Sequence, residues 1–194
     1  MKVIRLKKNM GKGAAVNVAA RTACEMGMTH LFQLDADWQH DISSCSRFLA
    51  AAEETPHAII CGYPIYDESV PEIRRKGREF SNGWARFVTL NHEIKDSLCG
   101  FRIYPLESYA RILGGHSLLS RRMGYDVDIL VQMLWQGLPI VNMGVHVTYP
   151  EDGISNFRMF HDNLDISLTY TRLCAGMLIR LPLLAWRSWK RRHP

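Results

Sequence analysis

LFQLDADWQHD, at residues 31–41, is an apolar run that ends in the two carboxylates of Asp35 and Asp37. Its first half is typical of a strand buried in a parallel sheet. Ahead of it, NMGKGAAVNVAA at residues 9–20 places two glycines around Lys12 and continues in an alanine-rich run that favours a helix. Because ligands of open α/β sheets bind beyond the carboxyl ends of the strands, this order predicts a ligand site beside the two carboxylates.

Strand and helix patterns alternate on either side of these stretches. We expect a strand at 2–6, a helix at 13–27, a strand at 29–35, a helix at 42–54 capped by Asp41 or Ser43, and a strand at 57–64. Beyond Pro71 we expect helices at 72–91, 107–115 and 126–137, short strands within 95–105 and 138–150, and a largely helical end up to Pro182. The pattern predicts an α/β fold with an open, mostly parallel sheet flanked by helices.

Length, charge and cysteine content limit the kinds of protein that this sequence can encode. The 194 residues suit one domain, and the net charge of +5 suits an anionic partner such as a nucleotide, a lipid phosphate or an acidic membrane surface. The five cysteines are odd in number and lack a CxxC pair, which argues against a disulfide framework or a structural zinc site. The first residues lack the apolar core of a signal peptide, and no uninterrupted apolar run approaches the roughly eighteen residues of a spanning helix.

Asp35 and Asp37 are candidate ligands of a divalent cation. A hard cation takes one or two carboxylates together with phosphate oxygens, and Gln39 or His40 could complete its shell. The alternative is a solvated acidic turn, because a pair of this spacing is common on its own.

Lys12 lies in a glycine-rich turn that opens a helix after a strand. Backbone N–H groups in such a turn, including that of Gly11, can face an anion. The Walker pattern is not met, since Lys12 is followed by Gly13. The alternative is a tight strand–helix turn with a solvated lysine.

Taken together, these motifs resemble those of the family 2 glycosyltransferases. The order N-x-G-K-G-A-A-V, a helix, then F-Q-L-D-A-D-x-Q-H is similar to the branch that contains dolichyl-phosphate mannose synthase and related bacterial enzymes. Further matches follow in CGFRIYP (99–105), GYDVDILVQMLWQG (124–137) and VTYPEDGISNFR (147–158). The resemblance spans residues 3 to about 180, and the joint pattern is more specific than any one motif.

The resemblance implies a GT-A fold and inverting transfer of a sugar from a UDP- or GDP-linked donor to a lipid or polyprenyl-phosphate acceptor. Asp35, Asp37 and Gln39 would hold Mg²⁺ or Mn²⁺ against the donor diphosphate. Lys12 and Gly11 would lie near the nucleotide or diphosphate. The processive Q-x-x-R-W signature is absent from the sequence, so transfer of a single sugar is expected.

The catalytic residue implied by the resemblance is Asp126, with Asp128 as its nearest rival. Either would act as general base on an acceptor hydroxyl, whereas an anionic phosphate acceptor would need only positioning. The alternative is that both simply favour a helix N-terminus. Further substrate-binding candidates come from the motif loops: Gly100, Phe101, Arg102 and Arg158.

We expect a catalytic domain at 1–172 and a separate amphipathic, basic tail at 173–194. The tail, with its tryptophans and arginines, would rest peripherally on the inner, cytoplasmic face of the cell membrane. The alternative is a final helix docked on the domain.

Members of the resembled family carry a strand–helix–strand unit ahead of the N-x-G-K-G strand, and this sequence lacks it. We therefore expect an N-terminally truncated GT-A fold with an exposed sheet edge, prone to form a homodimer. Two rival functions stay open: an incomplete fragment that dimerises and retains metal or membrane binding, and a nucleotidylyltransferase that releases pyrophosphate. No nucleic-acid partner is expected.

Overall fold

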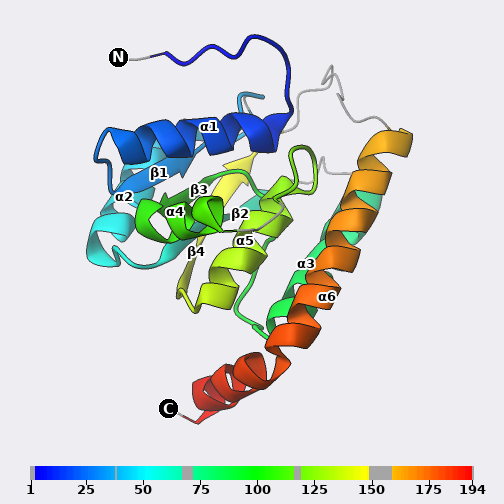
Figure 1. Cartoon of the computed structure of the whole chain (residues 1–194). Coiled ribbons are helices and arrows are strands. Elements are labelled where there is room, and N and C mark those ends of the chain that lie inside the picture. Colours follow the sequence, from blue (N-terminus) through cyan, green and yellow to red (C-terminus); the bar gives the residue numbers. More distant parts are fainter. Residues whose placement is uncertain (1–2, 38, 67–71, 116–118, 149–158, 194) are drawn as a thin grey trace.

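The computed structural model describes residues 3–37, 39–66, 72–115, 119–148 and 159–193 (Figure 1). A four-stranded sheet lies at its centre, in the order β1-β3-β2-β4. The strands are β1 (His30–Gln33), β2 (Ile59–Tyr66), β3 (Arg102–Pro105) and β4 (Ile140–Val147).

The sheet is mixed because of one strand. β3 is antiparallel to both of its neighbours, β1 and β2, whereas β2 and β4 are parallel. Three of the four strands therefore point the same way, which agrees with the expected α/β fold, but two of the three neighbouring pairs are antiparallel, so the sheet is mixed and not mostly parallel. The register pairs Gln33 with Arg102, so the loop before β3 lies at the carboxyl end of β1.

Helices cover both faces of the sheet. They are α1 (Lys12–Glu25), the 3₁₀ turn η1 (Ile42–Ser44), α2 (Cys45–Glu54), α3 (Glu72–Thr89), α4 (Leu106–Gly114), α5 (Tyr125–Gln136) and α6 (Met159–Arg192). α2 packs on one face through Phe48 against Ile60 and Phe101. The other helices share a larger core on the opposite face, where Ile59 and Cys61 of β2 point. Alternate residues of β2 thus serve the two cores, as strand geometry requires.

Several local predictions are confirmed. Asp41 caps η1 by accepting from the Ser43 backbone N–H at 2.9 Å. Gly27 follows α1 with a φ of +71°, a conformation that glycine adopts without strain. All five cysteines are free, as their odd number and spacing predicted.

Two predictions are wrong. Residues 3–6 form no strand: a strand needs a neighbour to complete its backbone hydrogen bonds, and no described strand pairs with this segment. α6 does not end at Pro182 but contains it. Its second half is held on the domain, because Arg187 donates to the Trp135 carbonyl at 2.7 Å and Arg191 to the Leu90 carbonyl at 2.9 Å. The predicted boundary between 172 and 173 falls inside this helix.

α6 also differs from expectation in its length and apolar character. Residues Leu164–Arg191 have a mean hydropathy of 1.2 in their most apolar window and are long enough to cross a membrane by length and composition. The arginines inside this helix interrupt its apolar run, so the run is shorter than the roughly eighteen residues of a spanning helix. α6 lies alongside α3 in Figure 1, and Leu173, Met177 and Leu184 are buried in the core.

Candidate active site

The predicted site residues meet at the carboxyl end of β1. Asp35 follows this strand, Lys12 begins α1, and Asp126 lies in the first turn of α5. Gly100 belongs to the loop that leads into β3. Four segments distant in sequence therefore converge where ligands of open α/β sheets bind.

Lys12 joins two of the predicted carboxylates. Its Nζ lies 2.7 Å from Asp35 Oδ1 and 2.6 Å from Asp126 Oδ2. Burial alone lowers the pKa of Lys12, but the charges of Asp126 and Asp35 and their hydrogen bonds outweigh it, so the pKa is raised. The ammonium is thus held charged between the two acids, and the solvated-lysine alternative does not apply.

Asp126 is held from three sides. Its Oδ2 accepts from Lys12, and its Oδ1 accepts from Gln33 Nε2 at 2.9 Å. Its backbone carbonyl accepts from Arg102 Nη1 at 2.7 Å. The side chain is 8% exposed, so the carboxylate reaches the surface of the site in one fixed orientation.

Gly100 lies directly against Asp35. A Cβ built on Gly100 would come within 2.2 Å of Asp35 Oδ2, which no side chain could tolerate in this arrangement. Gly11 likewise leaves no room for a side chain, on the Lys12 side of the site. Its φ is +92°, and a Cβ there would lie 2.4 Å from the Arg121 carbonyl oxygen. The Ala14 N–H donates to that carbonyl, so this N–H group at the start of α1 is bonded to the protein backbone and not left for a ligand.

Asp35 and Asp37 could hold a hard cation through their carboxylate oxygens. Asp37 Oδ1 accepts from the Gln39 backbone N–H at 3.1 Å, which holds the Asp37 carboxylate beside Gln39. His40 Nδ1 is buried and has no hydrogen-bond partner among the described residues, and His40 Nε2 lies 3.4 Å from Cys99 Sγ. Burial lowers the pKa of His40 despite the nearby charges of Asp35 and Asp37. A neutral imidazole with an unused nitrogen is compatible with a cation nearby.

Those ligands alone would not make a complete shell. Within the described residues, no group of three or more His, Cys, Asp and Glu side chains is close enough to form a metal cluster. With phosphate and water supplying the other oxygens, the two carboxylates would suit Mg²⁺ or Mn²⁺.

The predicted rival base, Asp128, lies elsewhere. Its side chain is fully buried and accepts from Arg172, from the Ser120 N–H at 2.7 Å and from Gln132 Nε2 at 2.7 Å. It therefore ties α5 to α6. The Asp-x-Asp spacing on a helix turns the two side chains to different sides, so of the two only Asp126 meets Lys12 at the candidate site.

Two motif residues lie beneath the site instead of lining it. Arg102 was expected near the diphosphate or acceptor, but it is fully buried and donates to the backbone carbonyls of Asp126 and Asp96. Phe101 is also fully buried and packs edge-on against Phe48, with ring centroids 4.7 Å apart. Both side chains are thus part of the core beneath the loop that precedes β3. Arg158 lies outside the described residues.

Comparison with known proteins identifies the family to which the chain belongs. The sequence model of glycosyl transferase family 2 matches residues 1–113, more than half of the chain and the part that holds Lys12, Asp35, Gly100 and Arg102. The chain belongs to glycosyl transferase family 2. The α/β sheet with its flanking helices agrees with that membership.

Relatives of this family 2 chain include a dolichyl-phosphate β-glucosyltransferase from Dictyostelium discoideum. It is 29% identical over 156 residues, which cover 76% of this chain and 46% of the relative. A solved structure of glucosyl-3-phosphoglycerate synthase from Mycobacterium tuberculosis, in complex with phosphoglyceric acid, is similar with a TM-score of 0.56 and 15% identity. That match covers 88% of this chain and 57% of the other, and it shows a shared GT-A fold. The chain thus spans about half the length of the relatives it matches.

Two residues of this family 2 site escaped the sequence analysis. Gln33 is buried in β1 and contacts Asp126, and its only signal was a polar side chain inside an apolar strand. Asp96 is buried below the loop before β3, where it accepts from Arg78 Nη1 at 2.8 Å and from the Cys99 N–H at 2.6 Å. Aspartate side chains often accept hydrogen bonds from backbone N–H groups two residues further on in a loop. The position of Asp96 at the start of this loop was therefore the feature of the sequence that could have indicated its role.

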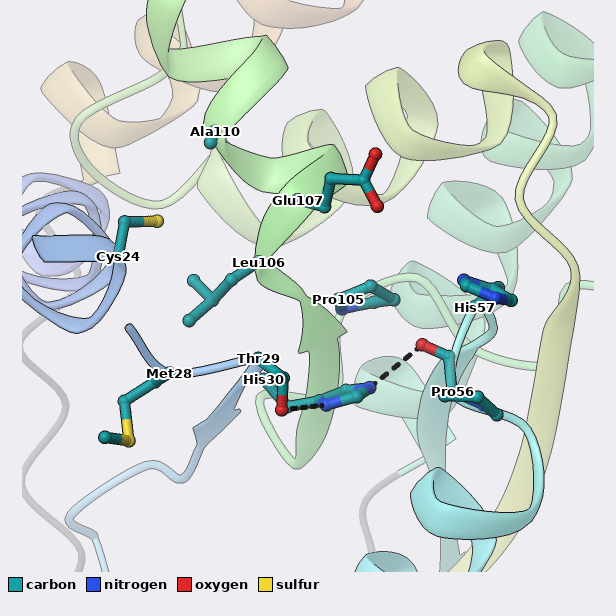
Figure 2. Close-up of a pocket in the computed structure, with 10 residues that line it drawn as sticks. All are labelled: Cys24, Met28, Thr29, His30, Pro56, His57, Pro105, Leu106, Glu107 and Ala110. Atoms are coloured by element: carbon teal, nitrogen blue, oxygen red, sulfur yellow. Dashed lines mark hydrogen bonds between the residues drawn. The ribbon is translucent and has the colours of Figure 1, made fainter. Parts of the chain in front are cut away.

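A cavity of about 540 Å³ lies away from these residues (Figure 2). It is bordered by Cys24, His30, Leu106 and Glu107, at the opposite end of β1 from Asp35. His30 is held there by contacts of 2.9 Å to the Pro56 carbonyl and 3.0 Å to Thr29 Oγ1 (Figure 2). The cavity therefore shares no side chain with the candidate site.

Proposed function

We propose that this chain transfers a single sugar, with inversion, from a nucleotide-sugar to a lipid-phosphate acceptor. The observation that carries the proposal is the Lys12 bridge between Asp35 and Asp126 in a family 2 fold. It brings a fixed positive charge and two carboxylates together at the carboxyl end of β1. The printed name of the Dictyostelium relative, a dolichyl-phosphate glucosyltransferase, supports the acceptor class.

Each residue has a separate task in this proposal. Asp35 and Asp37, with Gln39 beside them, would hold Mg²⁺ or Mn²⁺. The metal would supply Lewis-acid stabilisation of the departing diphosphate. Lys12 adds a positive charge where the negative charge of that leaving group develops. Its shared contact with Asp126 keeps the two halves of the site together.

Asp126 faces the acceptor in this arrangement. An acceptor hydroxyl must lose a proton as it attacks the sugar, and the fixed Asp126 carboxylate can accept it. An acceptor phosphate is already anionic, and Asp126 would then only orient the groups around it. The lipid-phosphate acceptor favours this second role.

The test is binding and turnover with a panel of UDP- and GDP-sugars. Isothermal titration of the purified chain with Mn²⁺, and then with EDTA, should give metal-dependent binding of one donor. Asp37→Asn should abolish it, whereas Asp41→Asn should leave it unchanged, because Asp41 only caps η1 and asparagine caps as well. Binding of no donor by the folded chain, or pyrophosphate release from a nucleoside triphosphate, would overturn the proposal.

The same proposal places the protein on the inner, cytoplasmic membrane face. Large apolar side chains are exposed along α6, including Leu168, Ile179, Trp186 and Trp189. The neighbouring helix α3 adds Phe80 and Phe87, which are 66% and 53% exposed. Because α6 is also anchored to the domain along its other side, contact parallel to the membrane surface fits it better than crossing.

Self-association is a further part of the proposal. Within the described strands, β1 is a sheet edge that pairs only with β3. Exposed Met28 and Leu34 flank this edge, being 51% and 42% exposed. Edge-to-edge pairing of two copies would cover it, and light scattering of the purified chain would report the dimer's mass.

A further inference from the structure

Asp126 is the end of a chain of buried hydrogen bonds that begins at Tyr104. The Tyr104 hydroxyl lies 3.2 Å from Gln33 Oε1, and Gln33 Nε2 lies 2.9 Å from Asp126 Oδ1. Tyr104 is fully buried and Gln33 is 5% exposed. The chain thus runs from the core to the candidate site through direct contacts between side chains.

The direction of this chain is set by chemistry. An ionised carboxylate only accepts hydrogen bonds, so the amide nitrogen of Gln33 must face Asp126 and its oxygen must face Tyr104. Burial raises the pKa of Tyr104 well above its usual value, so its hydroxyl remains a donor at any working pH. Tyr104 therefore donates to Gln33, and Gln33 in turn donates to Asp126.

We propose that Gln33, oriented by Tyr104, is a positioning residue that fixes the carboxylate of Asp126 for sugar transfer. The inference rests on the function proposed above. Lys12 holds one oxygen of Asp126 and Gln33 the other, so loss of Gln33 frees the carboxylate to rotate about the Lys12 contact. A carboxylate that no longer orients the reacting groups is costly even when substrate still binds, because catalysis depends on near-attack geometry.

The central variant is Gln33→Met, which keeps the side-chain volume and removes both hydrogen bonds. Turnover should fall by about tenfold to a hundredfold, while the donor dissociation constant from isothermal titration stays unchanged. Tyr104→Phe should shift turnover in the same direction by less, since Gln33 keeps its bond to Asp126. In an Asp126→Asn background, Gln33→Met should cause no further loss, because it acts through that carboxylate.

Gln132→Met is the matched control. Gln132 donates to Asp128 at 2.7 Å, so this variant loses a similar glutamine–aspartate bond on the same helix, away from Lys12. It should lower the melting temperature yet leave turnover at the wild-type value. Equal turnover losses in Gln33→Met and Gln132→Met, or full activity of Gln33→Met, would overturn the positioning role.

A second readout does not depend on activity. The melting-temperature loss caused by Gln33→Met should shrink in an Asp126→Ala background, because the bond that it removes is already gone. Additive losses would show that the two side chains are not coupled and would overturn the inference. If wild-type protein turned over no donor, the proposed function would fail, and this cycle would still decide whether Gln33 holds Asp126.

Discussion

Gly100 shows how closely the backbone approaches the candidate metal ligand. We expect Gly100→Ala to weaken metal-dependent donor binding by tenfold or more, on the order of 1.4 kcal/mol, because the new Cβ would displace the Asp35 carboxylate. Stability should change little, since the displaced atoms are the end of a side chain. Gly77→Ala, where nothing lies within 4 Å of the added Cβ, is the control for isothermal titration and thermal melting. Unaltered donor binding in Gly100→Ala would contradict this account of the site.

Lys12 stabilises the fold as well as the site. Lys12→Met leaves Asp126 and Asp35 without their shared cation, and we expect a loss of about 1–3 kcal/mol in the free energy of unfolding by urea. The pKa of Lys12 is raised on folding, so its contribution is complete below the unfolded value and declines only as pH rises through the higher folded value. The loss should therefore be equal at pH 6 and pH 8. Lys95→Met, which removes only a contact with the Tyr63 ring, should cost much less.

Individual residues were predictable where their chemistry is local. Asp35 follows an apolar strand, and Lys12 follows a glycine at a helix start, so both were found from the sequence. Their meeting with Asp126 was not predictable from local pattern, because Lys12 and Asp126 are 114 residues apart. The buried positions of Arg102 and Phe101 were missed for the same reason: a motif identifies residues that matter without saying which of them face the ligand.

At the scale of elements, the helices and three same-direction strands followed from hydrophobic periodicity and turn residues. The reversed direction of β3 did not, since a four-residue strand has the same local pattern whichever way it runs. Contacts with the rest of the protein also decide whether residues 3–6 form a strand and whether α6 continues through Pro182. A strand pattern without a neighbour stays extended, and a helix with a proline persists where its second half is anchored.

The junction between α5 and α6 rests on a buried ion pair. Asp128 is fully buried, and Arg172 of α6 is the charge that balances it. We expect Arg172→Leu to reduce the free energy of unfolding by about 3–5 kcal/mol, because it leaves a buried carboxylate uncompensated. Arg111→Leu, which breaks the exposed pair with Glu107, should cost less than about 1 kcal/mol. Urea unfolding of both variants measures the difference, and equal losses would show that Asp128 does not depend on Arg172.

At the scale of the whole molecule, the sheet, the site and the apolar helices occupy separate regions. The candidate site lies at the carboxyl end of β1, whereas α3 and α6 run together along one flank (Figure 1). The exposed apolar side chains of these two helices thus belong to elements other than β1 and the loop at its carboxyl end. Exposed Arg180, Lys190 and Arg191 lie on the same helix, α6, and suit an anionic bilayer.

Membrane contact through this flank gives a direct prediction. Wild-type protein should float with vesicles that contain acidic lipid and much less with neutral vesicles, because both apolar burial and basic charge contribute. Replacing Trp186 and Trp189 by serine should reduce the bound fraction severalfold, since these side chains are 55% and 60% exposed and suit the headgroup region. Leu49→Ser is the control: Leu49 is 51% exposed but lies on α2, across the sheet from α6. Equal flotation of the double variant and the wild type would contradict membrane contact through Trp186 and Trp189.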